Sequence, residues 1–258
     1  MTKELFVKDI MAKPTTISKS AKITEALDKM LDEGIDPLIA LNNASVVGTV
    51  SRQAIAEKLG SKQNTALAPT AIHVASVVEE DFTSVYPDEN MNVLVPLLQR
   101  YKLVVVYDSD HKLIGQVTAI DLLRKYPHDG SIKNALEKAV TIESDERVVH
   151  LRRRMLDDAI SRFVVTVNDK ITGIVTETDV AVAMRNFRKT VEDNHQDHRI
   201  RNLLVKDIMS APLISLDISA DYRDLVDLMI AKNISTVPIT DKGKLAGLVT
   251  RRSLVHAL

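Results

Sequence analysis

The chain has 258 residues, of which 45% are hydrophobic and 27% are charged, so it is long enough for one large domain or two ordinary ones. Its 34 basic and 35 acidic residues nearly cancel, which excludes a global attraction to nucleic acid or to anionic membranes. The lack of cysteine excludes disulfides, iron–sulfur clusters, thiolate zinc sites and a cysteine nucleophile.

The N-terminal sequence MTKELFVKDIM contains no signal-peptide hydrophobic region. No apolar run approaches the ~18 residues that are needed to span a bilayer. We therefore expect a soluble cytoplasmic protein with no membrane partner.

Three stretches of the chain resemble one another: MLDEGID at 30–36, MLDDAIS at 155–161 and MIAKNIS at 229–235. Each is followed by a glycine inside GTVS, GIVT or GLVT. With one further glycine, these positions are Gly48, Gly115, Gly173 and Gly247, which are 67, 58 and 74 residues apart. Such spacing indicates a repeated supersecondary unit.

An amphipathic helix precedes each of these glycines. In the first unit, apolar residues recur at i, i+3, i+4, i+7 and i+8 from position 23, which predicts one buried helix face. The same stripe returns 199 residues later, from Tyr222 to Ile230. It also returns 125 residues later with Arg152 intruding, and 67 residues later, from Asn90 to Leu98, in its most diverged form. The sequence therefore predicts four repeats.

Each unit reads as a short extended segment, the amphipathic helix, two β-rich runs and a second helix. The expected extended segments are 15–17, 84–86, 140–142 and 213–216. This order predicts an α+β fold of β-α-β-β-α repeats. Because one unit of this size cannot bury its own sheet, we expect the units to pair sheet to sheet.

The pattern VKDIM opens the chain at 7–11 and returns unchanged at 205–209, after a polar, charged stretch. That stretch predicts a linker. We expect the following division: repeat one at 6–60, repeat two at 72–126, repeat three at 132–188, a linker at 189–201 and repeat four at 202–258.

An opening DIM, an amphipathic helix and a closing run of Gly-hydrophobic-x-Thr/Ser-x-x-Asp-hydrophobic resemble the cystathionine-β-synthase (CBS) domain. Four copies would cover about 6–258. The resemblance implies that the repeats pair into two Bateman modules, one with two and three with four. It further implies a disk-like assembly, formed by internal pseudo-symmetry or as a homodimer.

A chain made only of four such domains resembles the γ subunit of AMP-activated protein kinase and stand-alone archaeal and bacterial regulators. The resemblance implies that clefts between paired domains bind adenosine compounds: AMP, ADP or ATP, or else S-adenosylmethionine or NAD-type ligands. It implies a non-enzymatic regulator of an effector protein on another chain. No metal is expected.

The closing motif is complete in two units, as GQVTAIDL with Thr118 and Asp121, and as GIVTETDV with Thr176 and Asp179. The hydroxyl stands where a strand gives way to a helix, near free backbone N–H groups that favour a phosphate. The aspartate can accept hydrogen bonds from both ribose hydroxyls. The alternative is a helix capping box that involves no ligand.

The other two units depart from the motif. Unit one reads GTVSRQAI, with Ala54 in place of the aspartate, and unit four reads GLVTRRSL, with Thr250 kept and Ser253 in place of the aspartate. With the pairing above, each module would contain one complete and one degraded site.

A phosphate also needs a nearby cation. Arg162 stands just before the central strand of unit three, Lys102 occupies a similar place in unit two, and Arg251 follows Thr250 directly. We expect Arg162 and Lys102 at the ligand, or alternatively as solvated charges at strand edges, whereas Arg251 reaches across the cleft to the ligand or simply covers the surface.

Two other functions stay open. Arginine clusters at 152–154 and 251–252 suggest an RNA- or ribosome-associated factor, although an aromatic content of 3% leaves few stacking platforms. A ligand-free assembly scaffold is the other. The stretch EDNHQDH at 192–198 could hold a metal but is better explained as a hydrated linker. The sequence contains no catalytic motif of the kinds GxGxxG, HExxH or GxSxG, so we expect no enzyme.

Overall fold

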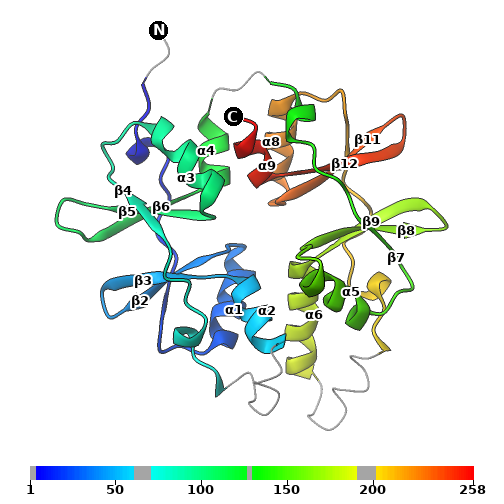
Figure 1. The fold of residues 1–258 in the computed structure, drawn as a ribbon, viewed down its shortest axis with the longest axis horizontal. Helices are drawn as coiled ribbons and strands as arrows, with labels where there is room; N and C mark the ends of the chain where they lie inside the picture. The colour runs from blue at the N-terminus through cyan, green and yellow to red at the C-terminus, as the bar shows by residue number, and fades with distance from the viewer. Residues whose placement is uncertain (1–3, 61–70, 127–129, 191–201) are drawn as a thin grey trace. The chain divides into compact units, whose positions relative to one another are not determined.

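The computed structural model describes residues 4–60, 71–126, 130–190 and 202–258. Within these residues it contains four three-stranded sheets, each flanked by helices (Figure 1). The α+β fold of β-α-β-β-α repeats is thereby confirmed. The linker predicted at 189–201 and the stretch 192–198 lie almost wholly outside the described residues; only the end of one helix, at 189–190, is included.

The first two repeats follow the predicted order. Repeat one contains β1 (Thr16–Ser18), α1 (Ile23–Glu33), β2 (Leu38–Asn42), β3 (Ser45–Val50) and α2 (Arg52–Gly60). Repeat two contains β4 (Thr83–Val85), α3 (Leu94–Arg100), β5 (Leu103–Tyr107), β6 (Leu113–Thr118) and α4 (Ala119–Lys125).

The last two repeats have the same arrangement. Repeat three contains β7 (Thr141–Glu143), α5 (Val148–Asp157), β8 (Arg162–Val167), β9 (Lys170–Thr176) and α6 (Glu177–Thr190). Repeat four contains β10 (Leu216–Asp217), α8 (Tyr222–Ala231), β11 (Thr236–Asp241), β12 (Lys244–Thr250) and α9 (Arg251–His256). Each repeat is preceded by a short 3-10 turn: η1 (Val7–Asp9), η4 (Val74–Ser76), η6 (Ile132–Ala135) and η7 (Val205–Asp207).

The chain forms two compact units, which are described separately. The first comprises Met1–Ala135, Ala220–Thr236 and Val249–Leu258, and the second comprises Leu136–Ser219 and Val237–Leu248. In the first unit, helices α3 and α4 of repeat two pack against α9 of repeat four.

The predicted helix stripes form the inner faces of the helices. Met30 of α1 and Met229 of α8 are fully buried, as is Leu151 of α5. In repeat two the stripe predicted from Asn90 was wrong at its start, because α3 begins only at Leu94, after the 3-10 turn η5 (Met91–Val93). Pro96 explains the short helix, since proline lacks an N–H group and is tolerated only in the first helical turn.

The two sheets of the first unit pack against each other, as predicted from their apolar strands. Ile39 of β2 and both Leu103 and Val105 of β5 form one buried cluster, which joins repeat one to repeat two. Apolar surface buried in this way stabilises the pair by roughly 25 cal/mol for each Å² removed from water. Neither sheet could bury this face alone.

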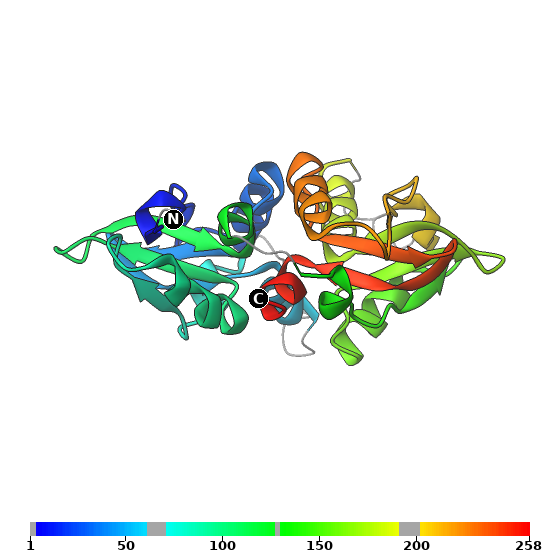
Figure 2. The same cartoon turned by 90° about the horizontal axis from the view of Figure 1, so that it is seen from above.

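Each 3-10 turn belongs to a segment that pairs with the other repeat of its module. Ala12 exchanges backbone hydrogen bonds of 2.9 and 3.0 Å with Gln116 of repeat two, and Glu79 does the same with Thr49 of repeat one. Figures 1 and 2 show the dark-blue N-terminal segment beside the green strands of repeat two. The pairing of repeat one with repeat two is therefore made by backbone as well as by side chains.

Repeats three and four exchange segments in the same way. Ser210 exchanges backbone bonds of 2.8 and 3.1 Å with Ile174, and Glu137 exchanges bonds of 2.8 and 2.9 Å with Leu248. The repeated VKDIM sequence lies in such a segment, and its methionines, Met11 and Met209, reach the glycines of repeats two and three, not those of their own repeats.

This exchange explains the four glycines that revealed the repeat. A Cβ atom placed on Gly173 would lie 2.7 Å from the carbonyl oxygen of Ser210, and one on Gly247 would lie 2.5 Å from that of Glu137. At Gly48 the nearest atom is the carbonyl oxygen of Glu79 in the corresponding segment. At Gly115 the nearest atom is the sulfur of Met11, at 2.8 Å. The glycines let the exchanged segment approach the strand.

Replacing Gly173 with alanine should therefore lower the free energy of unfolding. The added methyl group must push a backbone carbonyl aside, and such overpacking costs about 1–3 kcal/mol. Urea denaturation of Gly173→Ala against wild type measures this. The matched control is Lys170→Ala in the exposed start of the same strand, which should change stability by less than about 0.5 kcal/mol. Equal stability of both variants would contradict the packing role of the glycine.

Candidate functional site

The second unit contains a cavity of about 190 Å³ beside β8. The segment that follows η6 lines the cavity and pairs with β12 through Glu137 and Leu248. Its walls come from three places in the sequence: Glu137, Lys138 and Val140; Ile160, Ser161 and Arg162; and Leu248.

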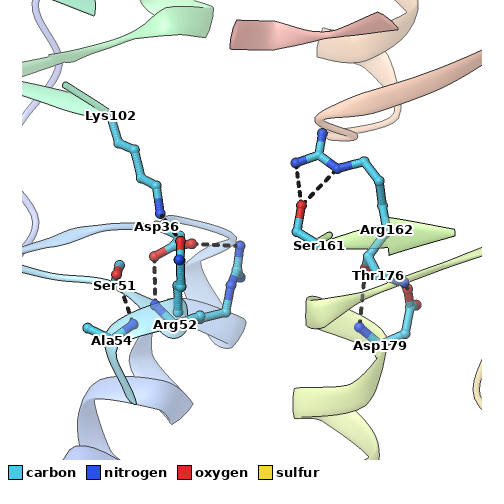
Figure 3. A network of polar contacts seen from close by, with 10 residues as sticks. Asp36, Ser51, Arg52, Ala54, Lys102, Ser161, Arg162, Thr176 and Asp179 are labelled. Carbon is cyan, nitrogen blue, oxygen red and sulfur yellow. Dashed lines mark hydrogen bonds and ion pairs between the residues drawn. The ribbon is translucent and has the colours of Figure 1, made fainter. Parts of the chain in front are cut away.

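Arg162 is one of the two cationic residues that line this cavity, the other being Lys138. It begins β8, pairs with Thr176 of β9, and donates from Nε and Nη2 to the Ser161 hydroxyl at 3.0 and 2.8 Å (Figure 3). Burial lowers the pKa of the guanidinium, while the carboxylates of Glu137 and Glu177 raise it. An arginine stays charged under these conditions, so a half-buried positive charge faces the cavity.

Asp179 lies one helical turn after Thr176, at the start of α6. Its Oδ2 accepts from the Thr176 backbone N–H at 2.7 Å and from the Thr176 hydroxyl at 2.6 Å, and its Oδ1 accepts from the Ser210 hydroxyl at 2.9 Å. The capping interaction is thus present. It does not use every lone pair of the carboxylate, so it does not exclude a ligand.

Asp121 makes the corresponding contacts in repeat two. Its Oδ2 accepts from the Thr118 N–H at 2.9 Å and from the Thr118 hydroxyl at 2.6 Å, at the start of α4. The two complete motifs therefore share the same contacts at Oδ2, and the predicted roles of these four residues stay predictions.

In repeats one and four the closing Ser or Thr forms capping hydrogen bonds within its own motif. The Ser51 hydroxyl accepts from the Ala54 N–H at 3.2 Å, with no carboxylate at that position. Thr250 and Ser253 cap α9 reciprocally, at 2.9 Å in each direction, and are only 4% and 5% exposed. Both hydroxyls of repeat four are engaged in this cap, and a ligand role for Thr250 and Ser253 stays a prediction.

An arginine follows the closing Ser or Thr in both degraded motifs, and both fold back onto their own repeat. Arg52 pairs with Asp36 at 3.4 Å, and their side chains are 19% and 16% exposed (Figure 3). Arg251 donates from Nε to the Ile234 carbonyl at 3.1 Å and from Nη2 to Asn233 Oδ1 at 3.4 Å, at the C-terminal end of α8. Both guanidinium groups thus fix a turn between a helix and a strand.

Arg251 also interacts electrostatically with Asp121 of repeat two. Burial lowers the pKa of its guanidinium, and the nearby carboxylate of Asp121 raises it. The predicted ligand role of Arg251 stays a prediction, since part of its donor set is already engaged by carbonyl groups.

Lys102 lies directly before β5, in the position that Ser161 has before β8. Its ammonium group donates to Gln53 Oε1 at 3.3 Å, so it points from repeat two toward the degraded motif of repeat one (Figure 3). The predicted contact of Lys102 with a phosphate stays a prediction.

Four arginines of the two clusters that suggested RNA binding have partners within the chain. Arg153 pairs with Asp157 at 3.5 Å, and Arg154 lies over the Phe163 ring at 4.7 Å. Arg252 donates to the Gln99 carbonyl at 3.4 Å, and Arg251 caps α8 as described. These contacts weaken the case for a basic surface that tracks a nucleic-acid backbone.

The comparisons with known proteins agree with this architecture. The CBS-domain model matches four times, at residues 7–61, 74–128, 132–186 and 205–258. The chain belongs to the CBS-domain family.

Two solved structures resemble this CBS-domain chain over nearly its whole length. Protein MJ1225 from Methanocaldococcus jannaschii, described as a proposed archaeal homologue of γ-AMPK, superposes with a TM-score of 0.80 at 21% identity, covering 98% of this chain and 99% of that one. A conserved protein from Pyrococcus horikoshii gives a TM-score of 0.65 at 21% identity, with the same coverage. At this identity the likeness shows the fold.

Among curated sequences, protein MJ1404 from Methanocaldococcus jannaschii is 21% identical over 98% of this CBS-domain chain, and the match covers 60% of MJ1404. Protein MK0525 from Methanopyrus kandleri is 28% identical over 47% of this chain and matches across 59% of its own length. The chain thus spans about 60% of the first curated relatives, and the activities of longer proteins are not transferred to it.

The sequence did not point to several residues of the candidate site. Ser210 was not singled out, although it follows the second VKDIM by one position, just as Ala12 follows the first. The alignment of these two copies is the signal that could have found it. Glu137 and Asp36 carried no comparable signal, because their positions depend on which segments pair.

Neither a metal centre nor a membrane span is found in the described parts of the chain. The residues searched contain no group of three or more potential metal ligands. Of the helices described, none is long and apolar enough to cross a bilayer.

Substituting Arg251 with alanine should destabilise the protein in the absence of any ligand. The change removes charge-assisted hydrogen bonds to the end of α8, each of which contributes about 1.5–3 kcal/mol. Thermal and urea unfolding of Arg251→Ala measure the loss. Arg153→Ala is the control, because its exposed pair with Asp157 contributes at most about 1 kcal/mol. Unchanged stability of Arg251→Ala would show that this arginine is free for another role.

Proposed function

We propose that this protein is a non-enzymatic regulator that binds adenine nucleotides of the AMP, ADP and ATP class and signals their presence to an effector protein. The observation that carries the proposal is the cavity of repeat three. Arg162 lines this cavity, and the strand register pairs it with Thr176 of β9, three residues before Asp179 at the start of α6; Thr176 and Asp179 are not among the lining residues.

The chemistry of these groups matches the parts of a nucleotide. Arg162 suits a phosphate, because guanidinium groups bind phosphate oxygens through directed, charge-assisted bonds. Asp179 suits ribose hydroxyls, since a carboxylate only accepts hydrogen bonds. The apolar walls at Val140, Ile160 and Leu248 suit the faces of an adenine ring.

Charges around Arg162 favour a ligand with few phosphates. Glu137 and Lys138 both line the cavity, and Glu177 follows Thr176 directly. The two carboxylates oppose the two cations, so a triphosphate would gain little net attraction here. AMP is therefore the first candidate for repeat three.

The resemblance of the fold to MJ1225 supports a regulatory role, since that protein is described as a proposed homologue of γ-AMPK. A ligand transmits a signal only to the extent that it binds two conformations with different affinity. The effector would be a separate protein. S-adenosylmethionine is the second candidate ligand, and the cavity's balanced charges are the observation that favours it.

Isothermal titration calorimetry with AMP, ADP, ATP and S-adenosylmethionine tests the proposal. We expect AMP to bind with micromolar affinity, or about −8 kcal/mol. Asp179→Asn and Arg162→Gln should each weaken binding at repeat three by about ten- to hundredfold, because each removes bonds to a charged group. Asp121→Asn should do the same at repeat two.

The matched control for these titrations is Asp169→Asn, an exposed residue in the β8–β9 turn whose positive φ of 63° asparagine also tolerates. It removes one negative charge without touching the cavity and should leave AMP binding unchanged. No binding of any of the four ligands to folded wild-type protein would refute the proposed function. Salt-sensitive RNA binding would then favour the hypothesis of an RNA-associated factor. Absence of RNA binding would favour the hypothesis of a ligand-free assembly scaffold.

A further inference from the structure

The carboxylates of Asp121 and Asp179 differ in the number of acceptor positions that remain free. A carboxylate has about four lone-pair positions, two on each oxygen. In both residues Oδ2 accepts two hydrogen bonds, from the N–H and the hydroxyl of the threonine three positions earlier. The difference lies at Oδ1.

Oδ1 of Asp179 already accepts one hydrogen bond, from the Ser210 hydroxyl at 2.9 Å. Among the described residues, no side chain or backbone group donates to Oδ1 of Asp121. Asp179 therefore has one lone-pair position left, whereas Asp121 has two.

The difference arises from the exchanged segments. Ser210 pairs its backbone with Ile174, the residue after Gly173, and Ala12 pairs its backbone with Gln116, the residue after Gly115. Ser210 and Ala12 thus occupy the same position relative to the two motifs. One carries a hydroxyl that reaches the aspartate, and the other carries only a methyl group.

A ribose presents two neighbouring hydroxyls, and a carboxylate that binds both needs two free positions. We propose that Ser210 sets how repeat three reads the sugar: with Ser210 bound, Asp179 accepts only one ribose hydroxyl, whereas Asp121 of repeat two accepts both. Repeat three then tolerates loss of one ribose hydroxyl, and repeat two does not. This inference rests on the proposed function, since it requires both aspartates to bind ribose.

Ser210 is accordingly a positioning residue that acts through Asp179. It is exposed in the described structure, so its replacement leaves no buried polar group unpaired. A variant at this position should fold normally. Its effect should be visible in the choice between sugars, which a role in stability alone would not change.

Calorimetric titration with AMP, 2′-deoxy-AMP and 3′-deoxy-AMP tests the inference. Repeat three is isolated in an Asp121→Asn background, and repeat two in an Asp179→Asn background. In repeat two, both deoxy ligands should bind about tenfold or more weakly than AMP, because each lacks one bond to a charged acceptor. In repeat three, at least one of them should bind within about threefold of AMP.

Swapping the two residues should swap the behaviour. Ser210→Ala should make repeat three discriminate against both deoxy ligands by about tenfold or more, and Ala12→Ser should reduce discrimination in repeat two to less than about threefold for one of them. Ser210→Thr keeps the hydroxyl and should behave as wild type.

The possible failures are distinguishable. If AMP binds both repeats but the ratio of affinities is the same in both and does not respond to Ser210→Ala, the inference is wrong and the proposed function stands. If wild-type protein binds none of the three ligands, both are overturned.

Discussion

The structure depends on a backbone contact between paired repeats. In each module, the segment before one repeat forms two hydrogen bonds with the strand residue that follows the closing glycine of the other repeat. At Gly48, Gly173 and Gly247 an added Cβ would lie within 2.7 Å of a carbonyl oxygen of this segment, so the closeness of the two backbones favours glycine there. The same contact brings Glu137 and Leu248 together and thereby forms the wall of the cavity beside Arg162. Pairing and site formation are consequences of one interaction.

The four copies of the closing motif have diverged in a related way. Where the aspartate is present, the residue after the threonine is Ala119 or Glu177, and the carboxylate is held at the helix start with lone pairs left over. Where it is absent, that residue is an arginine, and the guanidinium binds Asp36 or the end of α8. Loss of the aspartate thus accompanies a structural use of the same region. Two motifs keep the aspartate, and in the other two the arginine binds within its own repeat.

Much of this could be predicted from the sequence, because the signals are local or repeated. The apolar stripe through Met30 and Met229 predicted the helices, and the recurring glycines predicted the four units. What the sequence did not reveal depends on distant partners or on a single residue. Pro96 shortened α3 in the repeat whose stripe is the most diverged. The direction of Arg251 depends on where α8 ends in space, and the contact of Ser210 with Asp179 depends on which segments are exchanged. The spacing of residues along the chain predicts neither of these two contacts.

The most direct test of the account is hydrogen–deuterium exchange of the full chain with and without AMP, read by mass spectrometry. The account predicts slower exchange on binding in 137–140, 160–162 and 176–179, around the cavity and motif of repeat three, and in 118–121 of repeat two. It predicts no change in 51–54 or 250–253, where the motifs are closed. Protection confined to the arginine cluster at 152–154, or to the closed motifs, would contradict the claim that segment exchange builds a nucleotide site at the complete motifs.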